Sequence, residues 1–140
     1  ISGLKQLAAK HPYLDLSRVG AYGHSAGGYD AARALLKYGE FYKVAVSSAG
    51  NHDHRMSKAW WPEMWMGMPA EGTHYDSNSN MTLAHQLSGK LLLATGDLDN
   101  NVNPANATVP PWPVCVLTTL ARKPPSLPQH FLLSSPPLAL

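Results

Sequence analysis

The stretch "RVGAYGHSAGGYDAARALL", residues 18–36, predicts a strand, a sharp turn and a helix in direct succession. The segment 19–24 is short and apolar, which is typical of a buried strand. Beyond Ser25 the apolar residues recur with the period of a helix. Between the two patterns, Gly23-His24-Ser25-Ala26-Gly27 fits G-x-S-x-G. In that motif a strained strand-to-helix turn exposes a nucleophilic serine, and small neighbours let the backbone pass closely.

Two interpretations of Ser25 follow from this turn. As a nucleophile, it would stand where the next helix points backbone N–H groups toward a developing oxyanion, with the Ala26 N–H as one donor. The alternative is a glycine-rich turn around an inert serine. The strand before the motif and the helical pattern after it favour the nucleophile.

A serine nucleophile needs a base, and the base needs an acid that orients it. On this kind of turn the chain order is serine, acid, histidine. The segment "LLLATGDLDNNV" offers Asp97 and Asp99 after an apolar stretch, and either serves on spacing alone, although aspartate is also an ordinary turn residue. Of the seven histidines only His130 follows these acids.

Strand and helix patterns alternate along the first hundred residues, which predicts an α/β fold with parallel strands and flanking helices. The expected helices are 1–10, 26–36, a short one within 51–76, and 78–87, and the expected buried strands are 19–24, 44–47 and 90–95.

The last third of the sequence breaks this alternation. Residues 108–140 contain no Asp or Glu and most of the prolines, which disrupt helices and central strands. Only 114–120 could form a regular element. We therefore predict a partial α/β domain over 1–107 and an irregular Pro-rich tail over 108–140, and we hypothesise that a frameshift or a mispredicted coding end produced this tail.

Composition narrows the classes of partner and compartment. The net charge is +2 with scattered Lys and Arg, so no basic stripe indicates nucleic acid or an anionic membrane. Cys115 is the single cysteine, which excludes an internal disulfide. No apolar run approaches the ~20 residues of a membrane helix. The N-terminus has no signal-peptide layout, and the sequence reads as a piece of a longer one.

The segment "NHDHR" brings His52, Asp53 and His54 together like part of a metal site. Zinc catalysis needs three protein ligands, and no third one is evident, so we interpret this segment as loop structure and expect neither metal nor cofactor.

Several separated blocks in order resemble one known family: "GHSAGGYDAARALLKYGEFYKVAVSSAGNHDHR", "WPEMWMGMP", "YDSNSN" and "GKLLLATGDLDNNVNPAN". From about residue 1 to 106 the chain resembles the catalytic α/β-hydrolase domain of the prolyl oligopeptidase family, clan S9, and within it the dipeptidyl-peptidase IV-like branch. The resemblance implies that Ser25 is the nucleophile, that Asp99 rather than Asp97 is the triad aspartate, and that the Ala26 N–H is an oxyanion donor.

The resemblance also implies substrate contacts. Asn101 and Val102 match residues that position the substrate backbone and line the S1 pocket, and Trp61 falls where the family has an aromatic S1 residue, although core packing explains a tryptophan equally well. Ala26 departs from the family, which usually has an aromatic or polar residue there. His130 lies 31 residues after Asp99, near the family's spacing, but "LPQHFLL" does not match the usual Gly-His setting.

These observations lead to one favoured function and two alternatives. The favoured one is a serine peptidase that cleaves short peptides through Ser25, Asp99 and a histidine. The second is an esterase or acylaminoacyl hydrolase on the same fold, because a fold does not determine the substrate. The third is a non-catalytic fragment, inert or acting only as a partner-binding piece. It is supported by the missing first strands of the family, the histidine whose setting does not match and the unusual tail.

Overall fold

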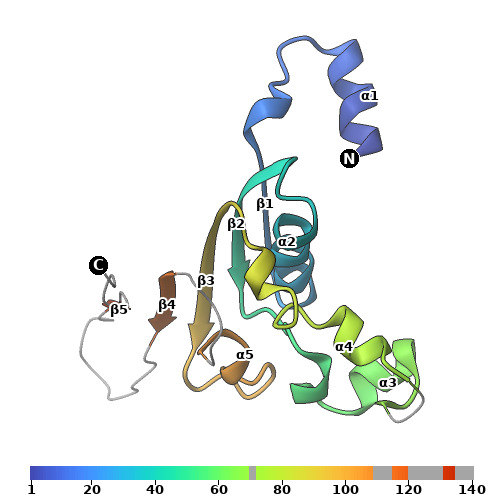
Figure 1. Cartoon of the computed structure of the whole chain (residues 1–140). Coiled ribbons are helices and arrows are strands. Elements are labelled where there is room, and N and C mark those ends of the chain that lie inside the picture. Colours follow the sequence, from blue (N-terminus) through green and yellow to red (C-terminus); the bar gives the residue numbers. More distant parts are fainter. Residues whose placement is uncertain (70–71, 109–114, 120–130, 135–140) are drawn as a thin grey trace.

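The computed structural model describes residues 1–69, 72–108, 115–119 and 131–134, the last two ranges by their backbone (Figure 1). The helices are α1 (Ser2–Lys10), α2 (Ala26–Lys37), α3 (Trp60–Met66), α4 (His74–Asn78) and α5 (Ala105–Thr108), with 3-10 turns η1 (Leu16–Arg18), η2 (His54–Met56) and η4 (Ala84–Gln86). The strands are β1 (Val19–His24), β2 (Tyr42–Ser48), β3 (Lys90–Gly96), β4 (Cys115–Thr119) and β5 (Phe131–Ser134).

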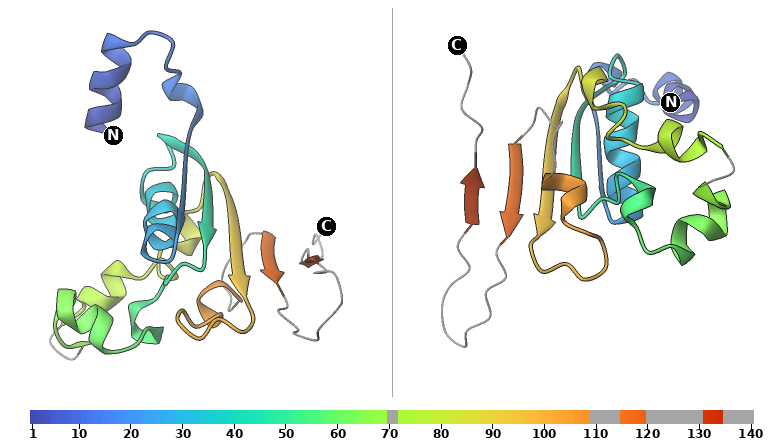
Figure 2. Two further views of the ribbon diagram at one scale, coloured as in Figure 1. Left: turned by 180° about the vertical axis from the view of Figure 1, so that it is seen from behind. Right: turned by 60° about the horizontal axis from the view of Figure 1, so that its bottom comes forward.

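The five strands form one sheet in the order β1-β2-β3-β4-β5 (Figure 2). The pairs from β1 to β4 are parallel, and β5 pairs antiparallel with β4. The first three strands and their helices form a partial α/β-hydrolase fold, as predicted. β4 falls within the predicted element 114–120. The prediction that only 114–120 of the tail could form a regular element was wrong for 131–134, because "FLLS" lies between Pro128 and Pro136 and is long enough for a short strand.

The register of the parallel strands brings their carboxyl ends to one edge of the sheet. His24 at the end of β1 lies opposite Ser48 at the end of β2, and Ser48 lies opposite Ala94 of β3. The loops that follow these strands therefore leave the sheet side by side. In open parallel sheets this edge is where ligands bind.

Helix α2 covers one face of β1 and β2, and the core lies beneath it (Figures 1 and 2). Its buried members are small or branched apolar side chains: Ala32, Leu35, Ala45, Leu91, Leu93 and Ala107. The prediction that 19–24 and 44–47 are buried strands was wrong for the face of the sheet that α2 does not cover, where Tyr22 is 89% exposed and Val44 is 45% exposed. A strand covered on one face buries only alternate residues.

The predicted helix over 78–87 was also wrong. Helix α4 ends at Asn78, and only the short turn η4 follows. Long-range bonds hold the intervening residues in another conformation, because the Asn80 N–H donates to the carbonyl of His52 at 2.8 Å and the Asn80 side chain donates to the carbonyl of Tyr29 at 3.0 Å. Asparagine favours such local alternatives to a helix.

None of the helices in the described ranges has the length and apolar character that crossing a bilayer requires.

Candidate active site

Ser25 occupies a strained turn between β1 and α2. Its φ of 58° and ψ of −120° lie in a region that non-glycine residues rarely adopt. Three backbone bonds hold it there: its own N–H donates to the Ser48 carbonyl at 2.9 Å, and its carbonyl accepts the N–H groups of Gly28 and Tyr29 at 3.0 and 3.1 Å. The turn therefore presents the half-buried Ser25 side chain at the carboxyl edge of the sheet.

The glycines around Ser25 have different roles. A Cβ atom on Gly23 would lie 2.1 Å from the carbonyl oxygen of Gly27, and one on Gly28 would lie 2.7 Å from that of Ser48. A Cβ atom on Gly27 would meet nothing within 4 Å. Close approach of strand and helix thus requires glycine at 23 and 28 and leaves room at 27.

A pocket of about 160 Å³ opens beside Ser25 and contains three other predicted site residues, Trp61, Asn101 and Val102. Asn51, Lys58 and Trp60 complete its lining. Trp61 makes edge-to-face contacts with Trp60 and with Trp65, at ring separations of 5.7 and 6.0 Å. Trp61 is therefore part of the pocket wall as well as of an aromatic cluster.

Asp99 begins the loop that carries Asn101 and Val102 into this pocket. Its Oδ1 accepts the backbone N–H groups of Asn101 at 2.8 Å and of Val102 at 3.0 Å. Within the described residues, Oδ2 has no hydrogen-bond partner and remains available to another group. Asp97, by contrast, is exposed and makes no hydrogen bond within the same residues.

Ala26, the residue after Ser25, lies at the start of α2 and lines a second pocket with Tyr29, His54, Trp61 and Trp65. Trp61 and Asn51 line both pockets, so the two adjoin across the Trp61 ring. Helix α2 begins at Ala26, whose N–H is one of the first-turn donors that point outward from a helix.

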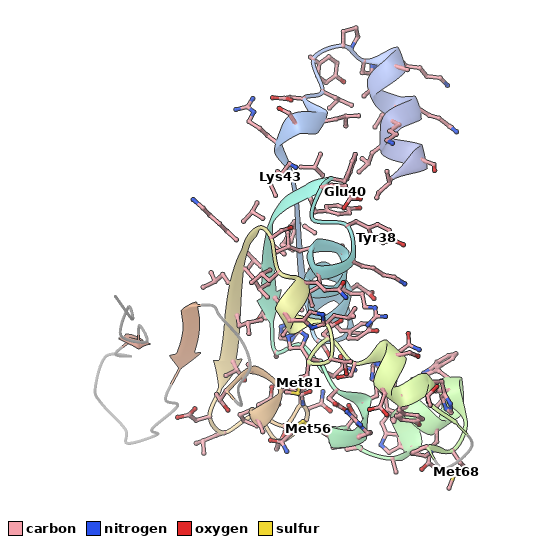
Figure 3. The ribbon with its side chains drawn as sticks, in the orientation of Figure 1. Tyr38, Glu40, Lys43, Met56, Met68 and Met81 are labelled. Carbon is pink, nitrogen blue, oxygen red and sulfur yellow. The ribbon has the colours of Figure 1, made fainter. Side chains whose placement is uncertain are left out.

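Three residues of the first pocket, Asn51, Lys58 and Trp60, were missed from the sequence. Asn51 and Lys58 come from the connection between β2 and α3, where no short motif marks either residue as functional, and Trp60 is the first residue of α3. In the sequence, only Trp60 could have been found, because it is next to Trp61, a predicted site residue. Met56, labelled in Figure 3, lies in this connection at the carboxyl end of the sheet, far from Lys43 and Glu40 at its amino end.

A partly buried ion pair between Asp53 and Arg55 anchors the same connection. Asp53 is 4% exposed and accepts hydrogen bonds from the Arg55 side chain and from the Ser79 hydroxyl, while its N–H donates to Asn106. Burial alone would raise the pKa of Asp53, but these bonds from Arg55 and Ser79 lower it below its usual value. Arg55 also pairs with Asp76 of α4. The "NHDHR" segment thus ties the pocket wall to α4 and α5.

His52, in the same "NHDHR" segment, is fully buried. The Asn80 Nδ2 group, which can only donate, lies 3.1 Å from Nδ1 of His52, so Nδ1 accepts and Nε2–H donates to the Ser47 hydroxyl at 3.1 Å. Burial and the nearby His54 lower the pKa of His52 to about 4. His52 is therefore neutral and structural.

Acid should destabilise the chain through His52. Its folded-state pKa of about 4 lies below the ordinary 6.5, so the unfolded chain binds this proton more readily. Stability from the neutral ring is present above pH 6.5 and falls by roughly 3 kcal/mol as the pH drops to 4. Urea unfolding at pH 7, 5 and 4 measures the loss.

Substituted chains separate the contribution of His52 to this loss of stability from that of the carboxylates that titrate in the same pH range. His52→Gln should flatten the curve between pH 6.5 and 4 by about that amount. His24→Gln, which replaces an exposed histidine, is the control for removing a histidine as such. Equal curves for His52→Gln and the unsubstituted chain would contradict this assignment.

The His54 ring packs against the Tyr29 ring, with the ring centroids 4.8 Å apart and the planes tilted by 49°. Its Nδ1 accepts from the Asn51 side chain at 3.3 Å, and burial lowers its pKa. Across the described part of the chain, no group of three His, Cys, Asp or Glu residues is placed to hold a metal ion. The remaining predicted site residue, His130, lies outside the described residues.

Comparisons with known proteins identify relatives of this arrangement. Human dipeptidyl peptidase 8 is 31% identical over 113 residues, covering 78% of this chain and 13% of the relative. The inactive dipeptidyl peptidase 10 of Rattus norvegicus is 30% identical over 105 residues, covering 74% of this chain and 13% of the relative. The chain thus spans about one eighth of these relatives.

Solved structures that resemble this chain also include dipeptidyl peptidases. A putative dipeptidyl aminopeptidase IV from Bacteroides ovatus matches 75% of this chain with a TM-score of 0.70 and 30% identity, and the chain covers 15% of it. Porphyromonas gingivalis dipeptidyl peptidase 4 matches 74% with a TM-score of 0.68 and 31% identity, and the chain again covers 15%. The family model described as the prolyl oligopeptidase family matches residues 1–109. The chain therefore belongs to the prolyl oligopeptidase family and, within it, to the dipeptidyl-peptidase IV-like branch.

Proposed function

We propose that this chain carries the nucleophilic serine of a serine-type peptidase that acts on short peptides. The observation that supports this most directly is the strained turn at Ser25, whose side chain lines a pocket with Trp61, Asn101 and Val102. Strain of this kind persists where the surrounding structure maintains it and is concentrated at functional sites.

In the proposed reaction, the Ser25 hydroxyl attacks the substrate carbonyl and passes its proton to a histidine, for which His130 is the candidate from the sequence. Asp99 orients that histidine through Oδ2, since Oδ1 is already held by the loop. The Ala26 N–H stabilises the oxyanion. Trp61 and Val102 hold the side chain before the scissile bond. No cofactor is needed for these steps.

The test is covalent labelling with a fluorophosphonate probe, followed by mass spectrometry of the labelled peptide. We expect the probe on Ser25, no labelling of Ser25→Ala, and slower labelling of His130→Gln. A folded chain that is not labelled would refute the proposal and leave the non-catalytic alternative. A labelled chain that hydrolyses short acyl esters but not dipeptidyl amides would favour the esterase alternative.

A further inference from the structure

The pocket beside Ser25 contains a single charged side chain among its lining residues, Lys58. Lys58 is exposed and carries an ammonium group with three donors. Its Nζ donates to Oδ1 of Asn101 at 3.4 Å, a long bond to a neutral partner. The positive charge thus faces the same space as the Ser25 hydroxyl.

The protein does not neutralise this charge within the described residues. Of the ion pairs there, none involves Lys58, so no described carboxylate lies within 4 Å of its Nζ. Asp99 lines the adjoining pocket with Lys58. The Asp99 carboxylate bonds the loop backbone and forms no ion pair with Lys58.

The other walls of the pocket are largely apolar. Trp60, Trp61 and Val102 supply its hydrophobic surface, and Asn51 and Asn101 are neutral. A group suited to this space has methylenes that pack against the tryptophan rings and a carboxylate at its end. Glutamate has this chemistry, whereas glutamine has the same shape without the charge.

We infer that Lys58 is a specificity-determining residue that selects peptides with an acidic side chain, glutamate above all, at the position whose carbonyl Ser25 attacks. This inference rests on the proposed peptidase function. Exposed ion pairs are weak, so the expected preference for glutamate over glutamine is about fivefold. Salt should reduce it, because the Debye length falls from about 10 Å at 0.1 M to about 3 Å at 1 M.

Binding tests the inference whether or not the chain is catalytically active. The ligands are N-acetyl-glutamate amide and N-acetyl-glutamine amide, followed by tryptophan fluorescence. We expect the glutamate ligand to bind about fivefold more tightly, Lys58→Met to remove the difference, and Lys58→Arg to keep it. Lys90→Met, which removes the same charge at the amino end of β3, should not alter it.

Hydrolysis provides the second readout. The rates of hydrolysis of the coumarin amides of Ala-Glu, Ala-Gln and Gly-Pro are compared. The effect of an acidic group after the scissile bond is measured separately, with Ala-Gln-Ala as the free acid and as the C-terminal amide. Equal binding of the two acetyl amides, or a preference that Lys58→Met leaves intact, would overturn the inference. The inference would also be overturned if the only effect of charge were a preference for Ala-Gln-Ala as the free acid over its C-terminal amide. Failure of fluorophosphonate labelling, by contrast, counts against the proposed function alone.

Discussion

Gly23→Ala is expected to lower the free energy of unfolding by about 3 kcal/mol or more, or to prevent folding. The new Cβ atom would lie 2.1 Å from the carbonyl oxygen and 2.3 Å from the carbonyl carbon of Gly27. Both are backbone atoms, so no side chain can rotate away to relieve the overlap. The strand and the helix would have to separate, which would also break the turn that holds Ser25.

Gly27→Ala is the matched control, because it adds the same methyl group in the same motif. Its Cβ atom would meet nothing within 4 Å, and Gly27 lies in the first turn of α2 without a positive φ. Alanine favours a helix over glycine, so this variant should be as stable as the unsubstituted chain or more stable by up to about 1 kcal/mol.

Urea denaturation followed by circular dichroism measures both variants. Similar losses for Gly23→Ala and Gly27→Ala would contradict the close approach of β1 to α2. Because Gly23→Ala is predicted to lower the free energy of unfolding and Gly27→Ala to leave it unchanged or raise it, even a modest separation between their unfolding midpoints is informative.

The turn at Ser25 could be predicted because its causes are local. Small residues, a strand and a helical pattern lie within nineteen residues of sequence. The requirement at Gly23 could not be separated from the freedom at Gly27, because that difference depends on which backbone atoms face each other across the turn.

Long-range contacts explain where the sequence misled. The 78–87 segment has a helical pattern, but Asn80 bonds to His52 and Tyr29, which lie far away in sequence. The half-exposed β1 was expected to be buried because the short segment "VGAYGH" does not reveal how many faces of the strand are covered. Lys58 was missed for a similar reason, since only the folded chain brings it beside Ser25.

Asp99→Asn is expected to lower the rate of fluorophosphonate labelling, and kcat/KM for a hydrolysed peptide, by about 10³–10⁴-fold. The same change in the catalytic triad of serine proteases costs about 10⁴ in kcat, because the histidine is then held in the wrong tautomer. The loop should survive, since the asparagine oxygen can still accept the N–H groups of Asn101 and Val102. The unfolding free energy should therefore change by less than about 1 kcal/mol.

Asp97→Asn removes the same charge two residues away and is the matched control. Asp97 is exposed and makes no hydrogen bond within the described residues, so the labelling rate should stay within about twofold of the unsubstituted chain, as for most surface substitutions. A large loss in Asp97→Asn with none in Asp99→Asn would assign the acid to Asp97. Equal small effects would mean that neither carboxylate orients the base, and that Asp99 serves only to carry Asn101 and Val102 into the pocket.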